Sequence, residues 1–245
     1  MRSKRSTSQE GNIQLKPSVE IGGDEVINPK SSSWRNKTRL LLAASCALWF
    51  FSVGVGLSIV WEYENAPGTA ANPYVQLPSD SQIKPVPGRA TLVMLVHPHC
   101  PCTRASVGEL ALLMAQAQGR VTAYVLFLKP RGFADDWEKT DLWWSAAGIP
   151  GVQVLKDADG IDAARFHAAT SGQTMLYDAE GRLLFSGGIT GARGHSGDNA
   201  GRSAIVALLT EGEAAQTETE VFGCPLFSKN SECRMGELNH AIHSH

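Results

Sequence analysis

The chain has 245 residues, of which 43% are hydrophobic and 19% are charged. This composition is typical of a globular protein and excludes a wholly disordered one. The formal net charge of −2 provides no global positive field, so the sequence does not predict a nucleic-acid partner. The five cysteines are too sparse for a small domain held together by disulfides, and their uneven placement is more informative than their number.

The N-terminal part of the chain has the pattern of a membrane anchor. Residues 1–39 are polar and are predicted to form a disordered cytoplasmic tail. Residues 40–61 carry no formal charge and match the roughly 20 residues that a transmembrane helix needs. Basic residues precede this segment and acidic residues follow it: Arg35, Lys37, Arg39, Glu62 and Glu64. The positive-inside rule then predicts a single-pass inner-membrane protein whose C-terminal domain is periplasmic. A cleaved signal peptide is the alternative.

Residues 62–88 contain several prolines and are predicted to be a semi-extended linker. From residue 89 to 211, short apolar runs alternate with helical patterns, which predicts one α/β domain with a mixed sheet covered on both faces. Residues 212–245 form a polar tail with cysteines and histidines. The predicted strands are 90–97, 121–128, 151–155, 173–177 and 183–186, and the predicted helices are 101–118, 137–147, 161–168 and 199–209.

The main chemical signal is a pair of cysteines, Cys100-Pro101-Cys102, between the first predicted strand and the first predicted helix. A helix N-terminus lowers the pKa of a thiol, and a second thiol two residues later can resolve a disulfide formed by the first. This arrangement predicts a thiol–disulfide redox centre. His97 and His99 directly precede the pair and, if protonated, are expected to raise its thiolate fraction.

The order of the elements, with a cysteine pair at the start of the first helix, resembles the thioredoxin fold. The segments Val152-Gln-Val-Leu-Lys-Asp157 and Thr174-Met-Leu-Tyr-Asp-Ala-Glu-Gly-Arg-Leu-Leu184 are similar to those of the membrane-anchored ResA/TlpA-like oxidoreductases. The whole chain, down to Phe222-Gly-Cys-Pro-Leu-Phe227, is also similar to the bacterial thioredoxin-like proteins labelled RedB. The resemblance implies that Cys100 attacks, that Cys102 resolves, that the partners are protein thiols or disulfides, and that no cofactor is needed.

Two features depart from the thioredoxin pattern. The family motif is Cys-x-x-Cys, whereas here one residue separates the thiols, so a disulfide between them would close a tighter ring and is expected to be reduced more readily. The family also has a cis-proline that faces the cysteines and lines the substrate groove. Gly172, preceded by Ser171, occupies that place here, so no cis peptide bond is expected there.

The residues around the pair leave other functions open. His97, His99, Cys100 and Cys102 are four potential ligands within six residues, and thiolate with imidazole suits copper or zinc. A copper-binding or metallochaperone module would use the two cysteines with a distant histidine, for which His195 is a candidate. A peroxidase-like enzyme, in which Cys100 is oxidised to a sulfenic acid and Cys102 resolves it, is a third possibility.

The segments after the hairpin are harder to interpret. The Gly-rich stretch 187–201 is predicted to be either a flexible crossover or a lid that brings Arg193 or His195 over the cysteine pair. Cys224 and Cys233 in the tail are compatible with a structural disulfide, with a second redox pair, or with a metal-binding tail.

Overall fold

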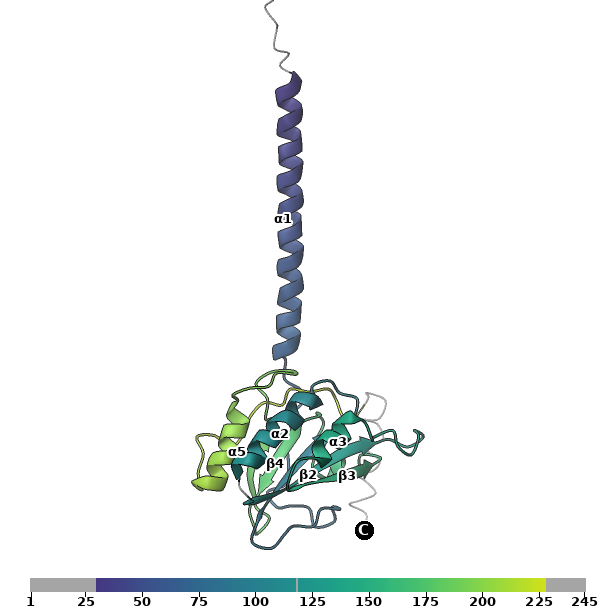
Figure 1. Cartoon of the computed structure of the whole chain (residues 1–245), viewed down its shortest axis with the longest axis vertical. Helices are drawn as coiled ribbons and strands as arrows, with labels where there is room; N and C mark the ends of the chain where they lie inside the picture. Colours follow the sequence, from purple (N-terminus) through teal and green to yellow (C-terminus); the bar gives the residue numbers. More distant parts are fainter. Residues whose placement is uncertain (1–29, 118, 228–245) are drawn as a thin grey trace, which may run out of the picture. The chain divides into compact units, whose positions relative to one another are not determined.

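A computed structural model describes residues 30–117 and 119–227, and the chain divides into two compact units, Met1–Gly54 and Val55–His245 (Figure 1). Helix α1, Lys30–Asn65, begins in the first unit and ends in the second. It starts before the apolar segment predicted from residue 40, so residues 30–39 of the predicted tail are helical. Residues 1–29 of that tail lie outside the described residues.

Helix α1 contains the candidate membrane span. Over Trp34–Asn65 it is long and apolar enough to cross a bilayer by length and composition. Its large apolar side chains are exposed along this stretch, among them Leu41, Phe51 and Ile59. An exposed helix that is apolar on all sides is costly in water and is stable in a hydrocarbon environment, which agrees with the predicted anchor.

The second unit is built on a five-stranded mixed sheet in the order β3-β2-β1-β4-β5. β1 pairs in parallel with β2, β2 pairs in parallel with β3, and the hairpin β4-β5 adds two antiparallel strands on the other side of β1. This confirms the predicted mixed sheet. The strand bounds are β1 Ala90–Val96, β2 Val121–Lys129, β3 Val152–Ala158, β4 Gln173–Tyr177 and β5 Leu183–Gly187.

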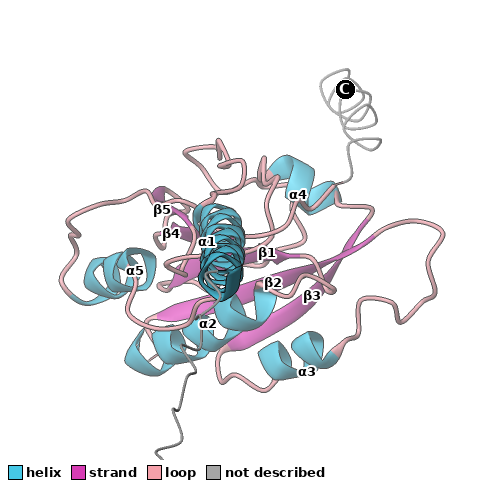
Figure 2. Cartoon of the chain, turned by 90° about the horizontal axis from the view of Figure 1, so that it is seen from above, coloured by secondary structure: helices cyan, strands magenta, loops and turns pink. Residues whose placement is uncertain are grey.

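Helices cover both faces of this sheet (Figure 2). Successive side chains of β1 point to opposite faces, as a strand requires: Leu92 and Met94 enter one apolar cluster, and Val93 and Leu95 enter the other. Because both faces are buried, β1 reads as a continuous apolar run. The first cluster lies under α2 Thr103–Ala117, α3 Asp141–Ala147 and α5 Ala200–Thr210, and the second lies under the short helix α4 Ile161–Arg165.

The segment predicted as a linker, residues 62–88, packs on the domain instead of acting as a spacer. The Leu77 N–H donates to the Gly181 carbonyl and the Leu183 N–H donates to the Val75 carbonyl, each at 2.8 Å. Ile83 is 4% exposed and belongs to the second apolar cluster. The buried Ile83 side chain and these backbone hydrogen bonds together hold the segment against the domain.

The first part of the predicted tail also belongs to the domain. Val221 and Leu226 are buried, and Leu226 packs in the second apolar cluster. An isolated antiparallel bridge joins Pro225 to Thr170. The compact domain therefore continues past residue 211 to at least Phe227, and the rest of the tail lies outside the described residues.

Candidate functional site

The cysteine pair lies where β1 ends and α2 begins. The Cys100 N–H donates to the His97 carbonyl at 3.1 Å, which closes a turn, and the Thr103 N–H donates to the Cys100 carbonyl at 3.1 Å as the helix starts. Pro101 is exposed in this first turn. Proline is tolerated there because the first N–H groups of a helix have no intrahelical partner. The local sequence thus places Cys100 at the N-terminal end of α2.

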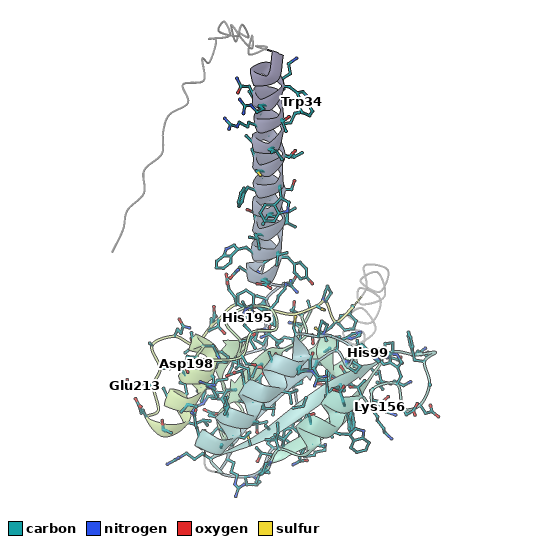
Figure 3. All side chains as sticks on the ribbon, turned by 45° about the horizontal axis from the view of Figure 1, so that its top comes forward. Trp34, His99, Lys156, His195, Asp198 and Glu213 are labelled. Atoms are coloured by element: carbon teal, nitrogen blue, oxygen red, sulfur yellow. The ribbon has the colours of Figure 1, made fainter. Side chains whose placement is uncertain are left out.

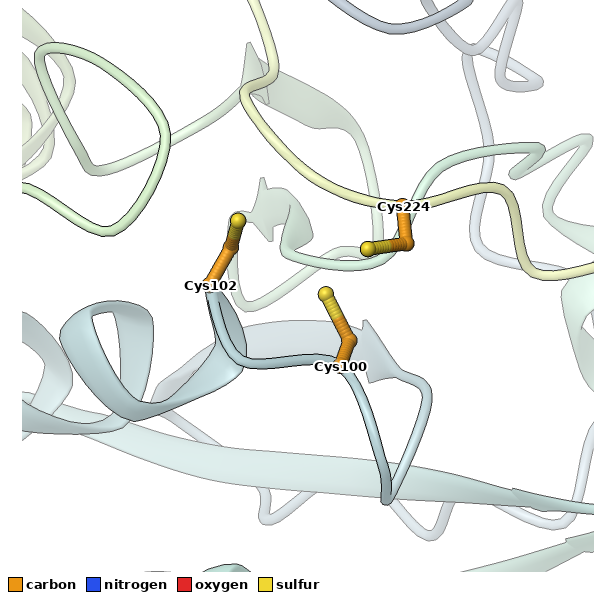
Figure 4. A group of neighbouring side chains, drawn as sticks. All are labelled: Cys100, Cys102 and Cys224. Atoms are coloured by element: carbon orange, nitrogen blue, oxygen red, sulfur yellow. The ribbon is translucent and has the colours of Figure 1, made fainter. Parts of the chain in front are cut away.

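A third thiol joins the pair. The sulfur atoms of Cys100, Cys102 and Cys224 all lie within 4.8 Å of one another. Figure 4 shows the Cys224 sulfur directed toward the Cys100 sulfur from a segment on the opposite side of the site. All three cysteines are free thiols in this structure, and Cys100 and Cys102 are only 2% and 6% exposed. The site is therefore a compact group of three sulfurs rather than an isolated pair.

The surroundings of Cys100 favour its thiolate form. Burial on its own would raise the pKa of Cys100. Hydrogen bonds from the Cys224 thiol and from the backbone N–H groups of Cys224, Cys102 and Thr103 act in the opposite direction and outweigh burial, so the pKa of Cys100 lies below its ordinary value. Two of these donors belong to the first turn of α2, where a helix N-terminus stabilises an anion.

The other two thiols remain protonated. Burial, followed by the charge of the Cys100 thiolate, raises the pKa of Cys102, while a contact with the Arg193 guanidinium acts against the increase. Burial and the hydrogen bond to Cys100 raise the pKa of Cys224 to about 12. The lowered pKa of Cys100 and the raised pKa values of Cys102 and Cys224 make Cys100, the residue predicted to be the nucleophile, the most acidic of the three thiols.

Arg193 reaches the site from the Gly-rich loop. Its backbone N–H donates to the Glu64 carbonyl at 3.0 Å and its Nε donates to the Ala66 carbonyl at 3.1 Å. Its Nη1 donates to the Gly223 carbonyl, and its guanidinium carbon lies 5.1 Å from the centre of the Tyr63 ring. These contacts hold the positive charge beside Cys102. This placement matches the lid alternative for the Gly-rich stretch.

His195 does not join the site. Its side chain is exposed, and its Nδ1 lies 3.1 Å from the Arg193 carbonyl oxygen. Figure 3 shows His195 and His99 well apart on the domain. Among the described residues, the group that could hold a metal ion consists of the three cysteines. The third candidate ligand is therefore Cys224, and the expectation that His195 completes the set is corrected.

The two histidines before the pair act differently from the prediction. Burial, followed by the charge of His99, lowers the pKa of His97, so the neutral imidazole is favoured. His97 and His99 pack on Trp137, with ring centroids 5.5 and 4.6 Å from the Trp137 ring. Neither histidine is among the causes that lower the pKa of Cys100. Backbone and thiol hydrogen bonds stabilise the thiolate in place of the expected histidine charge.

Ser171 and Gly172 face the pair from the loop before β4. Ser171 Oγ accepts from the His97 N–H at 2.8 Å and lies 2.9 Å from Thr103 Oγ1. The Gly172 N–H donates to the Leu95 carbonyl at 2.8 Å. Gly172 has a φ of 92°, a conformation that favours glycine, and none of the peptide bonds in the described ranges is cis. This loop therefore ties the end of β1 to the start of α2 without the family's proline.

A peroxidase-like enzyme needs a polar threonine and arginine shell around the thiolate, and the candidates beside the pair in the sequence, Thr103 and Arg104, have other side-chain partners. Thr103 Oγ1 donates to the His97 carbonyl at 3.3 Å, and the Arg104 guanidinium pairs with Asp141 on an exposed surface. Neither interaction involves the Cys100 sulfur. This arrangement does not supply the polar threonine and arginine shell that peroxide reduction would require.

The sequence left Cys224 open between a disulfide with Cys233, a second redox pair exchanging electrons with Cys100 and Cys102, and a metal-binding tail, and it gave no position for Cys224 beside Cys100. The signal that could have located it is the pattern around it: Phe222 and Leu226 are large apolar residues on either side of the cysteine, and both are buried. Cys233, its predicted disulfide partner or second redox thiol, lies outside the described residues.

Comparisons with known proteins find similar solved structures but no matching family model. No protein-family model matches the chain, and no curated protein matches it. An uncharacterized conserved protein from Geobacillus kaustophilus is 20% identical, with 67% of this chain and 93% of that one covered and a TM-score of 0.50. A hypothetical protein from Sinorhizobium meliloti is 23% identical, with 66% and 93% covered and a TM-score of 0.49.

A secreted disulfide oxidoreductase from Mycobacterium tuberculosis, homologous to DsbE of E. coli, is also similar: 23% identical, with 40% of this chain and 67% of that one covered and a TM-score of 0.33. At these identities the likeness concerns the fold alone. The strand order, with β1 central, an antiparallel hairpin at one edge and helices on both faces, is that of a thioredoxin-like protein. The chain therefore has a thioredoxin-like fold and carries three thiols at the end of its central strand.

Proposed function

We propose that this chain is a membrane-anchored thiol–disulfide oxidoreductase in which Cys100 is the nucleophile and Cys102 the resolving thiol. The observation that supports this most directly is the set of donors around Cys100, two of them at the start of α2, which lowers its pKa. A thiolate is the reactive form in disulfide exchange, and Cys102 beside it can displace a bound partner. Arg193 offsets part of the negative charge near the pair.

The reaction with a protein disulfide proceeds in two steps. The Cys100 thiolate attacks one sulfur of the substrate, which forms a mixed disulfide and releases the other sulfur as a thiolate. Cys102 then loses its proton to the released thiolate and attacks the Cys100 sulfur, so that a Cys100–Cys102 disulfide forms and the second substrate thiol leaves. The reverse sequence would oxidise substrate thiols. Protein thiols or disulfides are the proposed partners, and no cofactor is required.

The proposed location is the periplasmic face of the inner membrane, with α1 as the anchor. The length and apolar surface of Trp34–Asn65 support this, as does the charge distribution at its ends. The sequence resemblance to ResA/TlpA-like proteins and to the RedB group points to the same place. The full chain is expected to stay in the membrane pellet after alkaline carbonate extraction, whereas a chain lacking residues 1–61 is expected in the supernatant.

Metal binding is the second candidate function, and one observation favours it. Three soft sulfur ligands lie within 4.8 Å of one another in a mostly buried site, which suits copper(I). Cys100, Cys102 and Cys224 would be the ligands, without His195. If this candidate is the true function, the reduced full chain will bind one copper(I) tightly, Cys224→Ser will weaken the binding, and His195→Ala will leave it unchanged.

Reduction of insulin by the full chain in detergent micelles tests the oxidoreductase proposal. With a dithiol as the electron donor, the wild type is expected to accelerate the precipitation of insulin chains, and Cys100→Ser is expected to fall to the uncatalysed rate. Cys46→Ser is the matched control, because Cys46 is an exposed residue of α1 outside the site. Equal rates for the wild type and Cys100→Ser would reject the proposal.

A further inference from the structure

The segment 221–227 is held beside the active pair by backbone hydrogen bonds. The Ser171 N–H donates to the Cys224 carbonyl and the Leu226 N–H donates to the Ala169 carbonyl, each at 2.8 Å, on either side of the antiparallel bridge at Pro225. These are the bonds of a short added strand along residues 169–171. The loop that faces the cysteines is thus paired with the chain's own C-terminal segment.

Side-chain packing and close backbone contact fix this segment further. Leu226 is 4% exposed in the second apolar cluster. A Cβ on Gly223 would lie 1.9 Å from the Ser171 carbonyl oxygen, so only glycine allows the two backbones to come this close. The Gly223 carbonyl in turn accepts from Arg193 Nη1. The contacts of Gly223 before Cys224 and of Leu226 after it therefore fix the position of Cys224, which does not belong to a loose tail.

The chemistry of Cys224 matches this placement. Its sulfur lies within 4.8 Å of the Cys100 and Cys102 sulfurs, and its thiol and backbone N–H both donate to the Cys100 sulfur. A disulfide requires the two sulfurs to approach to about 2.05 Å, so the Cys100 and Cys224 side chains must move toward one another. Of the four free cysteines among residues 30–117 and 119–227, the remaining one, Cys46, is an exposed residue of α1.

We propose that Cys224 is a third redox thiol of this site, which forms a disulfide with Cys100. This inference rests on the proposed oxidoreductase function. It gives the site two possible resolving thiols on opposite sides of Cys100: Cys102, directly before α2, and Cys224, on the C-terminal segment. The oxidised site can then contain either a Cys100–Cys102 disulfide or a Cys100–Cys224 disulfide.

Formation of the Cys100–Cys224 disulfide is a thiol–disulfide exchange that conserves protons and electrons. After Cys100 has formed a mixed disulfide with a substrate, the Cys224 thiol gives its proton to the departing substrate thiolate and attacks the Cys100 sulfur. The Cys100–Cys224 bond forms as the bond from Cys100 to the substrate breaks. Cys102 can next attack the Cys100 sulfur in the same way, which forms Cys100–Cys102 and returns Cys224 to a thiol. The last step moves a disulfide within the protein and requires no oxidant or reductant.

Disulfide mapping on the full chain tests the proposal. The chain in detergent micelles is equilibrated with glutathione disulfide, quenched in acid, alkylated and cleaved with trypsin. Cys100 and Cys102 lie in the peptide 90–104, Cys224 lies in 203–229, and Cys233 lies in 230–234, so each disulfide other than Cys100–Cys102 joins different peptides. Cys102→Ser leaves Cys100 as the single thiol of the first peptide, which makes the assignment unambiguous.

In Cys102→Ser, a linked pair of peptides 90–104 and 203–229 is expected. The rate at which glutathione leaves Cys100 gives a second readout: it should be at least about tenfold slower in Cys102→Ser/Cys224→Ser than in Cys102→Ser, because no neighbouring thiol remains. Cys102→Ala serves if the serine variant unfolds, and thermal melting of each variant reports folding.

The outcomes separate this inference from the proposed function. If Cys224 stays alkylated, or is joined to Cys233, while Cys224→Ser still forms Cys100–Cys102, the third-thiol proposal is overturned and the oxidoreductase proposal stands. If Cys100 forms no disulfide in the wild type or any variant, both proposals fail.

Discussion

Replacing Glu109 by alanine is expected to destabilise the domain more than any exposed charge substitution. Glu109 lies on α2 and is 1% exposed. It forms an ion pair with Arg202 at the start of α5, and it accepts from the Gly197 N–H at 2.7 Å and from Asn199 Nδ2 at 3.1 Å. One carboxylate thus joins α2, α5 and the end of the Gly-rich loop that carries Arg193.

The size of the effect follows from what the substitution leaves behind. The Arg202 side chain is 10% exposed, and its remaining charged partner among the described residues is Asp198, whose carboxylate lies 3.0 Å away and is fully exposed. Removal of one partner of a buried ion pair costs about 3–5 kcal/mol of unfolding free energy, because the other charge stays buried without compensation. The exposed pair between Arg104 and Asp141 is a matched contrast, since such pairs contribute about 0–1 kcal/mol.

Urea unfolding of the full chain in micelles, followed by tryptophan fluorescence, measures both variants under the same conditions. Glu109→Ala is expected to lower the midpoint strongly, and Arg104→Ala is expected to change it little. The double variant Glu109→Leu/Arg202→Met should be more stable than Glu109→Ala, because it leaves no unpaired charge. The reasoning is refuted if Glu109→Ala and Arg104→Ala differ by less than about 1 kcal/mol.

Three further predictions concern pH and packing. The lowered pKa of Cys100 and the pKa of about 12 for Cys224 predict that iodoacetamide at pH 7 modifies Cys100 first, and faster modification of Cys224 would contradict this order. Gly223→Ala should lower the free energy of unfolding in urea by about 1–3 kcal/mol, because the added Cβ overpacks against the Ser171 carbonyl oxygen. Gly191→Ala should lower it less, because a Cβ on Gly191 would have nothing within 4 Å. Equal decreases would argue against the close approach of the two backbones at Gly223. Burial raises the pKa of Asp157 to about 7, so the folded state binds more protons than the unfolded state between about pH 4 and 7. The contribution of Asp157 to stability is therefore greatest at low pH and falls as the pH rises toward 7, by at most about 1.4 kcal/mol per pH unit. Asp157→Asn should flatten this pH dependence of the unfolding free energy. An unchanged slope would refute the raised pKa of Asp157.

The sequence predicted the architecture of the domain well because its elements are locally encoded. The apolar run over β1 and the turn before the hairpin strand β5 are both readable without tertiary information. The position of Cys100 at a strand-to-helix junction is equally local, and it located the centre of the site. For the Gly-rich loop the sequence left two alternatives, a flexible crossover and a lid that supplies Arg193 or His195, and the structure places Arg193 beside Cys102.

The features that sequence analysis missed depend on contacts between distant residues. Residues 62–88 have the composition of a linker, and nothing in them indicates that Ile83 is buried against the sheet. The pairing of Cys224 with the loop at Ser171 joins parts of the chain that carry no shared local pattern. Burial, followed by the charge of His99, lowers the pKa of His97 and so disfavours the protonated form on which its expected effect depended, and this burial comes from neighbouring elements.

A redox titration of the full chain tests the central claim most directly. The protein is equilibrated over a range of ratios of glutathione to glutathione disulfide, quenched in acid and alkylated, and the number of free thiols is read by mass spectrometry. The account predicts a two-electron transition that disappears in Cys100→Ser and persists in Cys46→Ser. Thiols that remain fully alkylated across all ratios, or a transition that survives in Cys100→Ser, would contradict it.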